Sequence, residues 1–290
     1  MNILKISRII GVSDLTFNIK TIIEDIYLRI FISDSPPIVV TFTGGMGAQI
    51  ISAAIYFYLI NLGFEVYADL SYFNKMPYKA EEKQKGDISQ WGWQLDCFGL
   101  LPDSFHTLIN TDRKKQKIIP DGIEKVILGM NALKMDSIKK IFIESNLLDE
   151  ILPIKYRKNY LCIHIRRGDY LSLARYIVDD KLFIDIAKKT VGLVSGVVVL
   201  SDSVIDNSFR CEMSRLYKNS LFLDEIDAID AHRIMRNANF LICSNSQFSL
   251  TAGLLNNNGL IFLPKKWFDV NLHPKLEAII NQMSEFNVLK

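Results

Sequence analysis

Three short apolar runs in the second half of the chain each end directly in a polar loop. The runs are Tyr160–Ile165, Gly196–Leu200 and Phe240–Cys243. Their length and their β-branched residues predict buried strands. Stretches of helical periodicity lie between them, and strands that alternate with helices build a parallel sheet. The carboxyl ends of parallel strands meet at one edge, where open α/β folds bind ligands. We therefore expect the three polar loops to converge on one cleft.

The first half repeats this order of elements once. Ile38–Phe42 predicts a strand, a glycine turn follows over 43–49, and an apolar helix is expected over Ile50–Leu62 before a second strand at Phe64–Asp69. Further helices are expected over 123–133, 180–190, 228–237 and 250–255 and at the end of the chain. Further strands are expected over 141–144, 221–223 and 260–263. Loops are expected over 74–86 and 113–122.

The predicted fold class is α/β with three segments. Residues 1–36 form a helical leader that Pro36 and Pro37 end, residues 37–158 a first α/β domain, and residues 159–290 a second one.

Charge and composition exclude several classes of protein. A formal net charge of +2 gives no bulk positive potential for nucleic acid. The four cysteines and four histidines lack the spacing of a disulfide framework or a metal site, so we expect no metal cofactor and a reducing compartment. The first residues lack a signal-peptide layout, and no apolar stretch reaches the ~20 residues of a membrane span. We expect a cytoplasmic protein, and docking at the inner face of a membrane stays open.

The loop after Tyr160–Ile165 is the strongest functional signal. It contains His164, Arg166, Arg167 and Asp169 within six residues. A guanidinium matches phosphate oxygens bidentately and keeps its charge, so the arginines indicate a phosphate-bearing ligand. Adjacent residues of an extended chain point to opposite sides, so one arginine should reach the ligand while the other braces the loop or pairs with Asp169. His164 fits a phosphate or ribose contact or a core position, and Asp169 fits a base or an arginine partner.

The remaining polar loops each permit a ligand contact or a purely structural role. Gly44-Gly45-Met46-Gly47 opens a helix, where backbone amides bind anions, but it also suits a tight turn. Ser246-Gln247-Phe248-Ser249 suits a diphosphate or an ordinary helix cap. Asp202, after Ser201, could accept hydrogen bonds from a nucleoside or merely end a strand. The glycine turn lacks G-K-[ST], which makes a P-loop kinase an unfavoured alternative.

Taken together, these strings resemble the bacterial α1,2-fucosyltransferases, relatives of the protein O-fucosyltransferases and the α1,6-fucosyltransferases. That family shares a G-G-x-G-N-Q opening, an H-x-R-R-x-D loop, a short S-D segment, an N-S-x-F-S block and a P-x-x-W. The corresponding segments here are Gly44–Gln49, His164–Asp169, Ser201-Asp202, Asn245–Ser249 and Pro264–Trp267, in the same order from about residue 38 to 268.

The resemblance implies two facing Rossmann-like domains of the GT-B type, the first on the acceptor side and the second on the donor side. It implies an inverting, metal-independent transfer of L-fucose from GDP-β-L-fucose to a hydroxyl of a glycan, α1,2 to galactose in a surface polysaccharide, with an acceptor that can be lipid-linked. Arg166 and Asp169 would be catalytic. The donor would contact His164, Arg167, Gly44, Gly45, Gly47, Gln49, Ser201, Asp202, Asn245, Ser246, Gln247, Phe248 and Ser249.

The chain departs from the family pattern in three respects. Ala48 stands where the glycine motif has asparagine, Leu250-Thr251-Ala252-Gly253 stand where the family has a tryptophan pair, and the expected leader has no counterpart in the compact members of the family. Two alternatives follow from these departures. One is the same chemistry with another GDP-deoxyhexose, and the other is a protein that binds a nucleotide sugar without catalysis.

Overall fold

The structure of the protein is a computed structural model. It describes residues 36–75, 92–107, 116–119, 121–142, 151–157, 159–172, 177–224, 226–257, 259–264 and 286–289.

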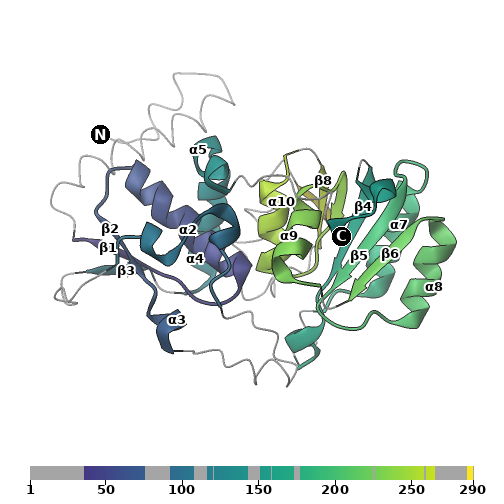
Figure 1. Cartoon of the computed structure of the whole chain (residues 1–290), viewed down its shortest axis with the longest axis horizontal. Coiled ribbons are helices and arrows are strands. Elements are labelled where there is room, and N and C mark those ends of the chain that lie inside the picture. The colour runs from purple at the N-terminus through teal and green to yellow at the C-terminus, as the bar shows by residue number, and fades with distance from the viewer. Residues whose placement is uncertain are drawn as a thin grey trace, which may run out of the picture.

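A small parallel sheet forms the centre of the first half (Figure 1). Its order is β2-β1-β3, from the strands β1 (Ile38–Thr41), β2 (Val66–Asp69) and β3 (Lys117–Ile119). Helices α2 (Met46–Asn61) and α4 (Ile123–Leu133) pack against each other beside it, and the short α3 (Ser71–Lys75) and α5 (Asp136–Lys139) complete this half. Most of α2 is buried because it contacts the sheet, α4 and the second half of the chain.

The second half is built on a larger sheet in which every pairing is parallel, in the order β6-β5-β4-β7-β8-β9. The strands are β4 (Tyr160–Ile165), β5 (Gly196–Ser201), β6 (Ser220–Asp224), β7 (Phe240–Ile242), β8 (Leu260–Pro264) and β9 (Phe286–Leu289). The described part of this half contains the helices α7 (Asp180–Thr190), α8 (Asn207–Leu216), α9 (Ala228–Arg236) and α10 (Gln247–Leu255).

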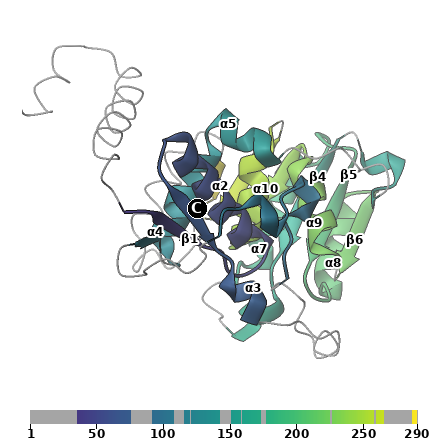
Figure 2. The same cartoon turned by 60° about the vertical axis from the view of Figure 1, so that its left-hand side comes forward.

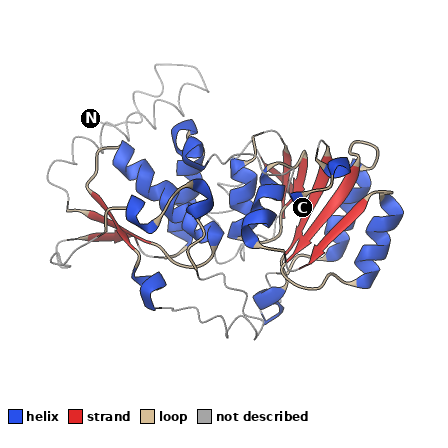
Figure 3. Ribbon diagram, viewed as in Figure 1, coloured by secondary structure: helices blue, strands red, loops and turns tan. Residues whose placement is uncertain are grey.

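Side-chain alternation along β4 and β5 builds a core on each face of this sheet. Leu161 and Ile163 belong to the core that contains Phe183 and Phe209 of α7 and α8. Cys162, one residue out of phase, belongs to the core that reaches α9, α10 and the first half. Figures 1 and 3 accordingly show α7 and α8 on the outer face of the sheet and α9 and α10 on the face toward the first half. Fully buried strands of this kind require a helix layer on both sides.

The two halves meet where α10 packs against α2, which Figures 1 and 2 show side by side. They approach each other closely at Gly47. A Cβ atom added there would lie 2.6 Å from the backbone carbon of Gln247 and 2.6 Å from the backbone nitrogen of Phe248. Only a residue without a side chain permits this contact between the two helix N-termini.

The predicted α/β class with parallel strands is confirmed, and several elements differ in detail. Helices α2 and α10 begin three to four residues before the expected starts, inside the polar loops. The strand expected over 141–144 is wrong at residues 141 and 142, since Lys140–Phe142 form a 3-10 turn (η6) in which Phe142 is buried against Phe98. Residues 143 and 144 lie outside the described part. Strand β3 occupies part of an expected loop.

At the ends of the chain, β9 forms where a terminal helix was expected, although residues 265–285 lie outside the described part. Residues 1–35, which include nearly all of the expected leader, lie outside it as well. Within the described ranges, no helix is long and apolar enough to cross a membrane.

Candidate active site

A cavity of about 250 Å³ lies at the carboxyl edge of the larger sheet. The second half contributes residues at and after the ends of β4 and β5, a residue after β6, and the first turns of α9 and α10. The first half contributes the start of α2 and Gln94. The polar members are Gln94, His164, Arg166, Tyr170, Ser201, Asp202, Ser246 and Gln247. The three polar loops therefore converge as predicted, because parallel strands end at a common edge.

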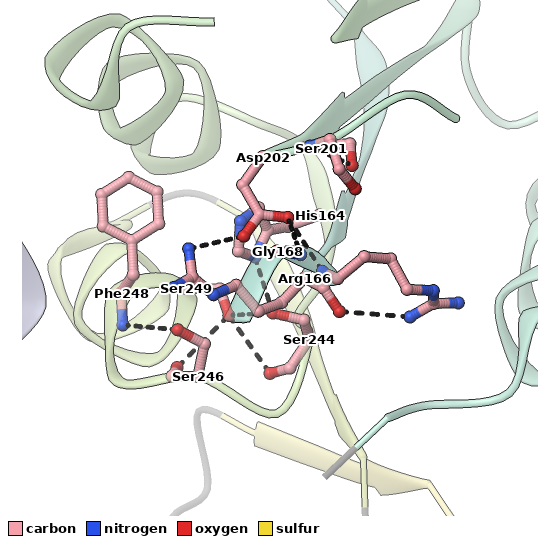
Figure 4. Close-up of polar contacts among 11 residues, drawn as sticks. His164, Arg166, Gly168, Ser201, Asp202, Ser244, Ser246, Phe248 and Ser249 are labelled. Atoms are coloured by element: carbon pink, nitrogen blue, oxygen red, sulfur yellow. Dashed lines mark hydrogen bonds and ion pairs between the residues drawn. The ribbon is translucent and has the colours of Figure 1, made fainter. Parts of the chain in front are cut away.

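Arg166 lies in this cavity, at the end of β4 (Figure 4). Its Nη1 is 2.6 Å from Oδ2 of Asp202, and both side chains are largely buried, with exposed fractions of 14% and 11%. The guanidinium carbon also lies 5.4 Å from the ring centre of Tyr170, a cation–π distance. The ion pair and the aromatic ring hold this cation at the cavity wall.

Asp202 organises the arginine loop from the neighbouring strand end. Its Oδ1 accepts hydrogen bonds from the backbone N–H groups of Arg167, at 2.8 Å, and Gly168, at 3.2 Å. Oδ2 makes no hydrogen bond with regular geometry to the residues that the structure describes, and it contacts Arg166 as an ion pair. A Cβ atom on Gly168 would collide with Oδ2, so glycine leaves the space that this carboxylate occupies. One carboxylate thus sets both the loop backbone and the position of Arg166.

Arg167 points away from the cavity. Its guanidinium pairs with Asp180, the first residue of α7, and also donates to the carbonyl oxygen of Arg166. The predicted division between the two arginines is therefore present, with one at the cavity and the other bracing the loop. The brace is Asp180, and the side chain of Asp169, the partner considered from the sequence, lies outside the described part of the structure.

His164 is a buried neutral histidine at the floor of the cavity. Its Nδ1 is 2.7 Å from the hydroxyl of Ser244, and its ring lies 5.5 Å from that of Phe248, centre to centre. Burial, and then the charge of Arg166, lower the pKa of His164 from 6.5 to about 3. The imidazole therefore stays uncharged at neutral pH and can act as a hydrogen-bonding group, but not as a general acid with a pKa near 7.

We expect His164 to make the folded state acid-sensitive. Between pH 6.5 and about 3 the unfolded chain takes up a proton that the folded chain excludes at His164, so stability falls as the pH falls through this window. The free energy of unfolding should drop by up to about 1.4 kcal/mol per pH unit from this residue. Urea unfolding of the protein and of His164→Gln at several pH values measures the difference. The pKa of buried His232 is lowered too, so the free energy of unfolding of the variant should still depend on pH, but less steeply than that of the wild-type protein. If the free energy of unfolding of His164→Gln falls with pH as steeply as that of the wild-type protein, the result would contradict the lowered pKa of His164.

Two helix N-termini face the cavity beside Arg166. Gly45 precedes α2 and Ser246 precedes α10, and neither helix has an acidic residue in its first turn. Each N-terminus contributes partial positive charge and backbone N–H groups. Ser246 also caps α10, because its hydroxyl accepts the N–H of Phe248 at 3.2 Å. The cavity thus combines one guanidinium with two helix dipoles, an arrangement suited to a diphosphate.

Five of the residues predicted to contact a donor do not line the cavity: Gly44, Gln49, Arg167, Asn245 and Ser249. Gln49 is fully buried, and its carboxamide makes hydrogen bonds to the backbone of Gly44, Gly92 and Gln94. The hydroxyl of Ser249 is buried and donates to backbone carbonyl groups of its own loop. Gly44 has φ +71°, which glycine adopts freely, and makes the turn into α2. These residues shape the walls of the cavity from behind.

Gln94 and Tyr170 line the cavity although no sequence motif pointed to them. Tyr170 directly follows the arginine loop, which is the only signal that could have found it. Gln94 comes from a segment with no periodicity, and only the fold brings it to α2. Among the described residues, no three His, Cys, Asp or Glu side chains gather to hold a metal ion, and all four cysteines are free thiols.

Comparison with known proteins yields distant likenesses only. No protein-family model matches the chain, and no curated protein matches its sequence. Among solved structures, POFUT1 in complex with GDP aligns at a TM-score of 0.47 and 12% identity, over 77% of this chain and 95% of that one. The fucosyltransferase NodZ from Bradyrhizobium aligns at 0.38 and 11%, over 77% and 94%. E. coli ADP-heptose LPS heptosyltransferase II aligns at 0.42 and 9%, over 87% and 90%.

Proposed function

We propose that the protein is a glycosyltransferase that binds a nucleotide-diphosphate sugar in the cavity at Arg166. The observation that carries the proposal is the position of this guanidinium beside the N-termini of α2 and α10. In glycosyl transfer the bond from the sugar to the diphosphate breaks, and negative charge accumulates on the departing phosphate. Fixed positive groups stabilise that charge most strongly where water is excluded.

The choice of donor and product rests on the order of motifs in the sequence. We propose GDP-β-L-fucose as donor, a glycan hydroxyl as acceptor, α1,2 on galactose, and a metal-independent reaction with inversion. The acceptor side would be the domain of residues 37–158 and the donor side that of residues 159–290, two Rossmann-like units facing each other, in a cytoplasmic enzyme that can meet a lipid-linked acceptor at the membrane. Another GDP-deoxyhexose fits the same cavity chemistry.

Each group then has a defined task. Arg166 stabilises the β-phosphate as GDP leaves, while the acceptor oxygen forms the new bond to the anomeric carbon from the opposite face. Asp169 takes the proton of that hydroxyl. Asp202 holds the loop and Arg166 in place through contacts of 2.6 to 3.2 Å. His164 stays neutral and presents its ring to the cavity as a hydrogen-bonding group.

A thermal-shift panel tests the donor class. A ligand that binds only the folded state raises the melting temperature, by an amount that grows with its concentration relative to its Kd. We expect GDP and GDP-β-L-fucose to raise it, and UDP-, CMP- and dTDP-sugars to leave it unchanged at equal concentration. The same shift in excess chelator is expected for a metal-independent site. Stabilisation by a different nucleotide sugar alone would overturn the choice of GDP, and no stabilisation by any of them would overturn the proposed function.

A further inference from the structure

The two halves contribute very different chemistry to the cavity. The second half supplies its arginine, its carboxylate, its histidine and its hydroxyl groups. The first half supplies Gly45, Met46, Gly47, Ala48 and Gln94. Among these described residues, Gln94 alone has a polar side chain, so any side-chain hydrogen bond to a ligand from this wall comes from its carboxamide.

The backbone of Gln94 is anchored from behind the cavity wall. Its N–H donates to Oε1 of Gln49 at 2.9 Å, and its carbonyl oxygen accepts from Sγ of Cys97 at 3.4 Å. Gln49 is fully buried, and its Nε2 donates to the carbonyl oxygens of Gly44, at 2.9 Å, and Gly92, at 2.8 Å. The segment around Gln94 is thereby tied to the glycine turn that opens α2, and a residue held in this way can present its side chain in a defined position.

The carboxamide of Gln94 makes no hydrogen bond with the described part of the chain, while its side chain is half-buried at the cavity. A carboxamide both donates and accepts hydrogen bonds, as a hydroxyl group does, so the two form matched pairs. It carries no charge, and Arg166 and the two helix N-termini already supply positive charge for a phosphate. Sugar hydroxyl groups are its natural complement in a site where most of the wall is apolar.

We propose that Gln94 is a specificity-determining residue that binds a hydroxyl of the transferred sugar. This inference rests on the proposed function, because it presupposes that a nucleotide sugar occupies the cavity. The second half and the N-terminus of α2 then hold the nucleotide diphosphate, and the only polar side chain by which the described first half contacts the sugar is that of Gln94. A sugar that lacks the matching hydroxyl leaves the carboxamide without a hydrogen-bond partner, and such a sugar should therefore bind more weakly.

Titration calorimetry with GDP and with GDP-β-L-fucose tests the inference on three variants. Gln94→Ala, and Gln94→Met as a variant of similar length without hydrogen-bonding atoms, should weaken binding of GDP-β-L-fucose by about three- to tenfold, the range of one neutral hydrogen bond. Their Kd for GDP should match that of the wild-type protein. Gln247→Ala is the matched control, since Gln247 is the glutamine that the second half places in the same cavity, and we expect it to weaken both ligands alike.

The outcomes separate this inference from the proposed function. If Gln94→Ala and Gln94→Met leave both Kd values unchanged, the sugar contact is wrong and the nucleotide-sugar site stands. If they weaken GDP and GDP-β-L-fucose equally, Gln94 contacts the nucleotide and the inference also fails. A wild-type protein that binds neither ligand overturns the proposed donor together with the inference. Melting temperatures of all variants, measured in parallel, show whether each binds as a folded protein.

Discussion

Replacing Arg166 with alanine is expected to reduce the rate of sugar transfer by about 100- to 1,000-fold, while the protein stays folded. Removal of one preorganised group that stabilises developing charge has this effect on turnover. The loss follows from the place of Arg166 at the cavity, 2.6 Å from Asp202 and next to two helix N-termini. The measurement is the release of GDP from GDP-β-L-fucose, with and without a glycan acceptor, together with the melting temperature of the variant.

Arg210 provides a matched control for this experiment. It pairs with Asp224, as Arg166 pairs with Asp202, but it belongs to α8 and does not line the cavity. Arg210→Ala should therefore transfer sugar at the wild-type rate. Folded Arg166→Ala with wild-type turnover would remove the basis for the mechanism. A wild-type protein that binds GDP-β-L-fucose but never releases GDP would favour the alternative of a non-catalytic binding protein.

Replacing Gly47 with alanine is expected to lower the free energy of unfolding by about 1–3 kcal/mol, the cost of inserting atoms into a packed interior. The added carbon would lie 2.6 Å from backbone atoms of Gln247 and Phe248, and backbone atoms cannot move aside as a flexible side chain can. Helices α2 and α10 must separate instead, and both carry residues of the cavity wall. We also expect weaker binding of GDP, measured by calorimetry beside urea unfolding.

Gly92 offers the control for this substitution. A Cβ atom built there meets no atom of the described residues within 4 Å, so Gly92→Ala adds the same methyl group without a clash against them. It should leave the free energy of unfolding within about 0.5 kcal/mol of the wild-type value. Equal stability of Gly47→Ala and the wild-type protein would mean that the two halves do not meet as tightly as the contact between α2 and α10 indicates.

Much of the second half could be predicted because local patterns and tertiary structure agree there. The strands β4 and β5 are continuous apolar runs, and each is followed by polar residues that end a strand. The convergence of these loops required only the general geometry of parallel sheets. Prediction failed where tertiary packing overrides local preference, as at Phe142, which looks like a strand residue and sits in a 3-10 turn against Phe98.

The sequence by itself determined that this is an α/β protein with an arginine loop at a strand end, because strand periodicity and guanidinium chemistry are local properties of the chain. Only the tertiary structure decided which arginine faces the cavity, that Asp202 positions it, and that Gln94 completes the wall. Those assignments depend on contacts between residues far apart in the sequence, as between Arg166 and Asp202 or Gly47 and Gln247. No local pattern encodes such distances, because they arise only when the two sheets and their helices pack together.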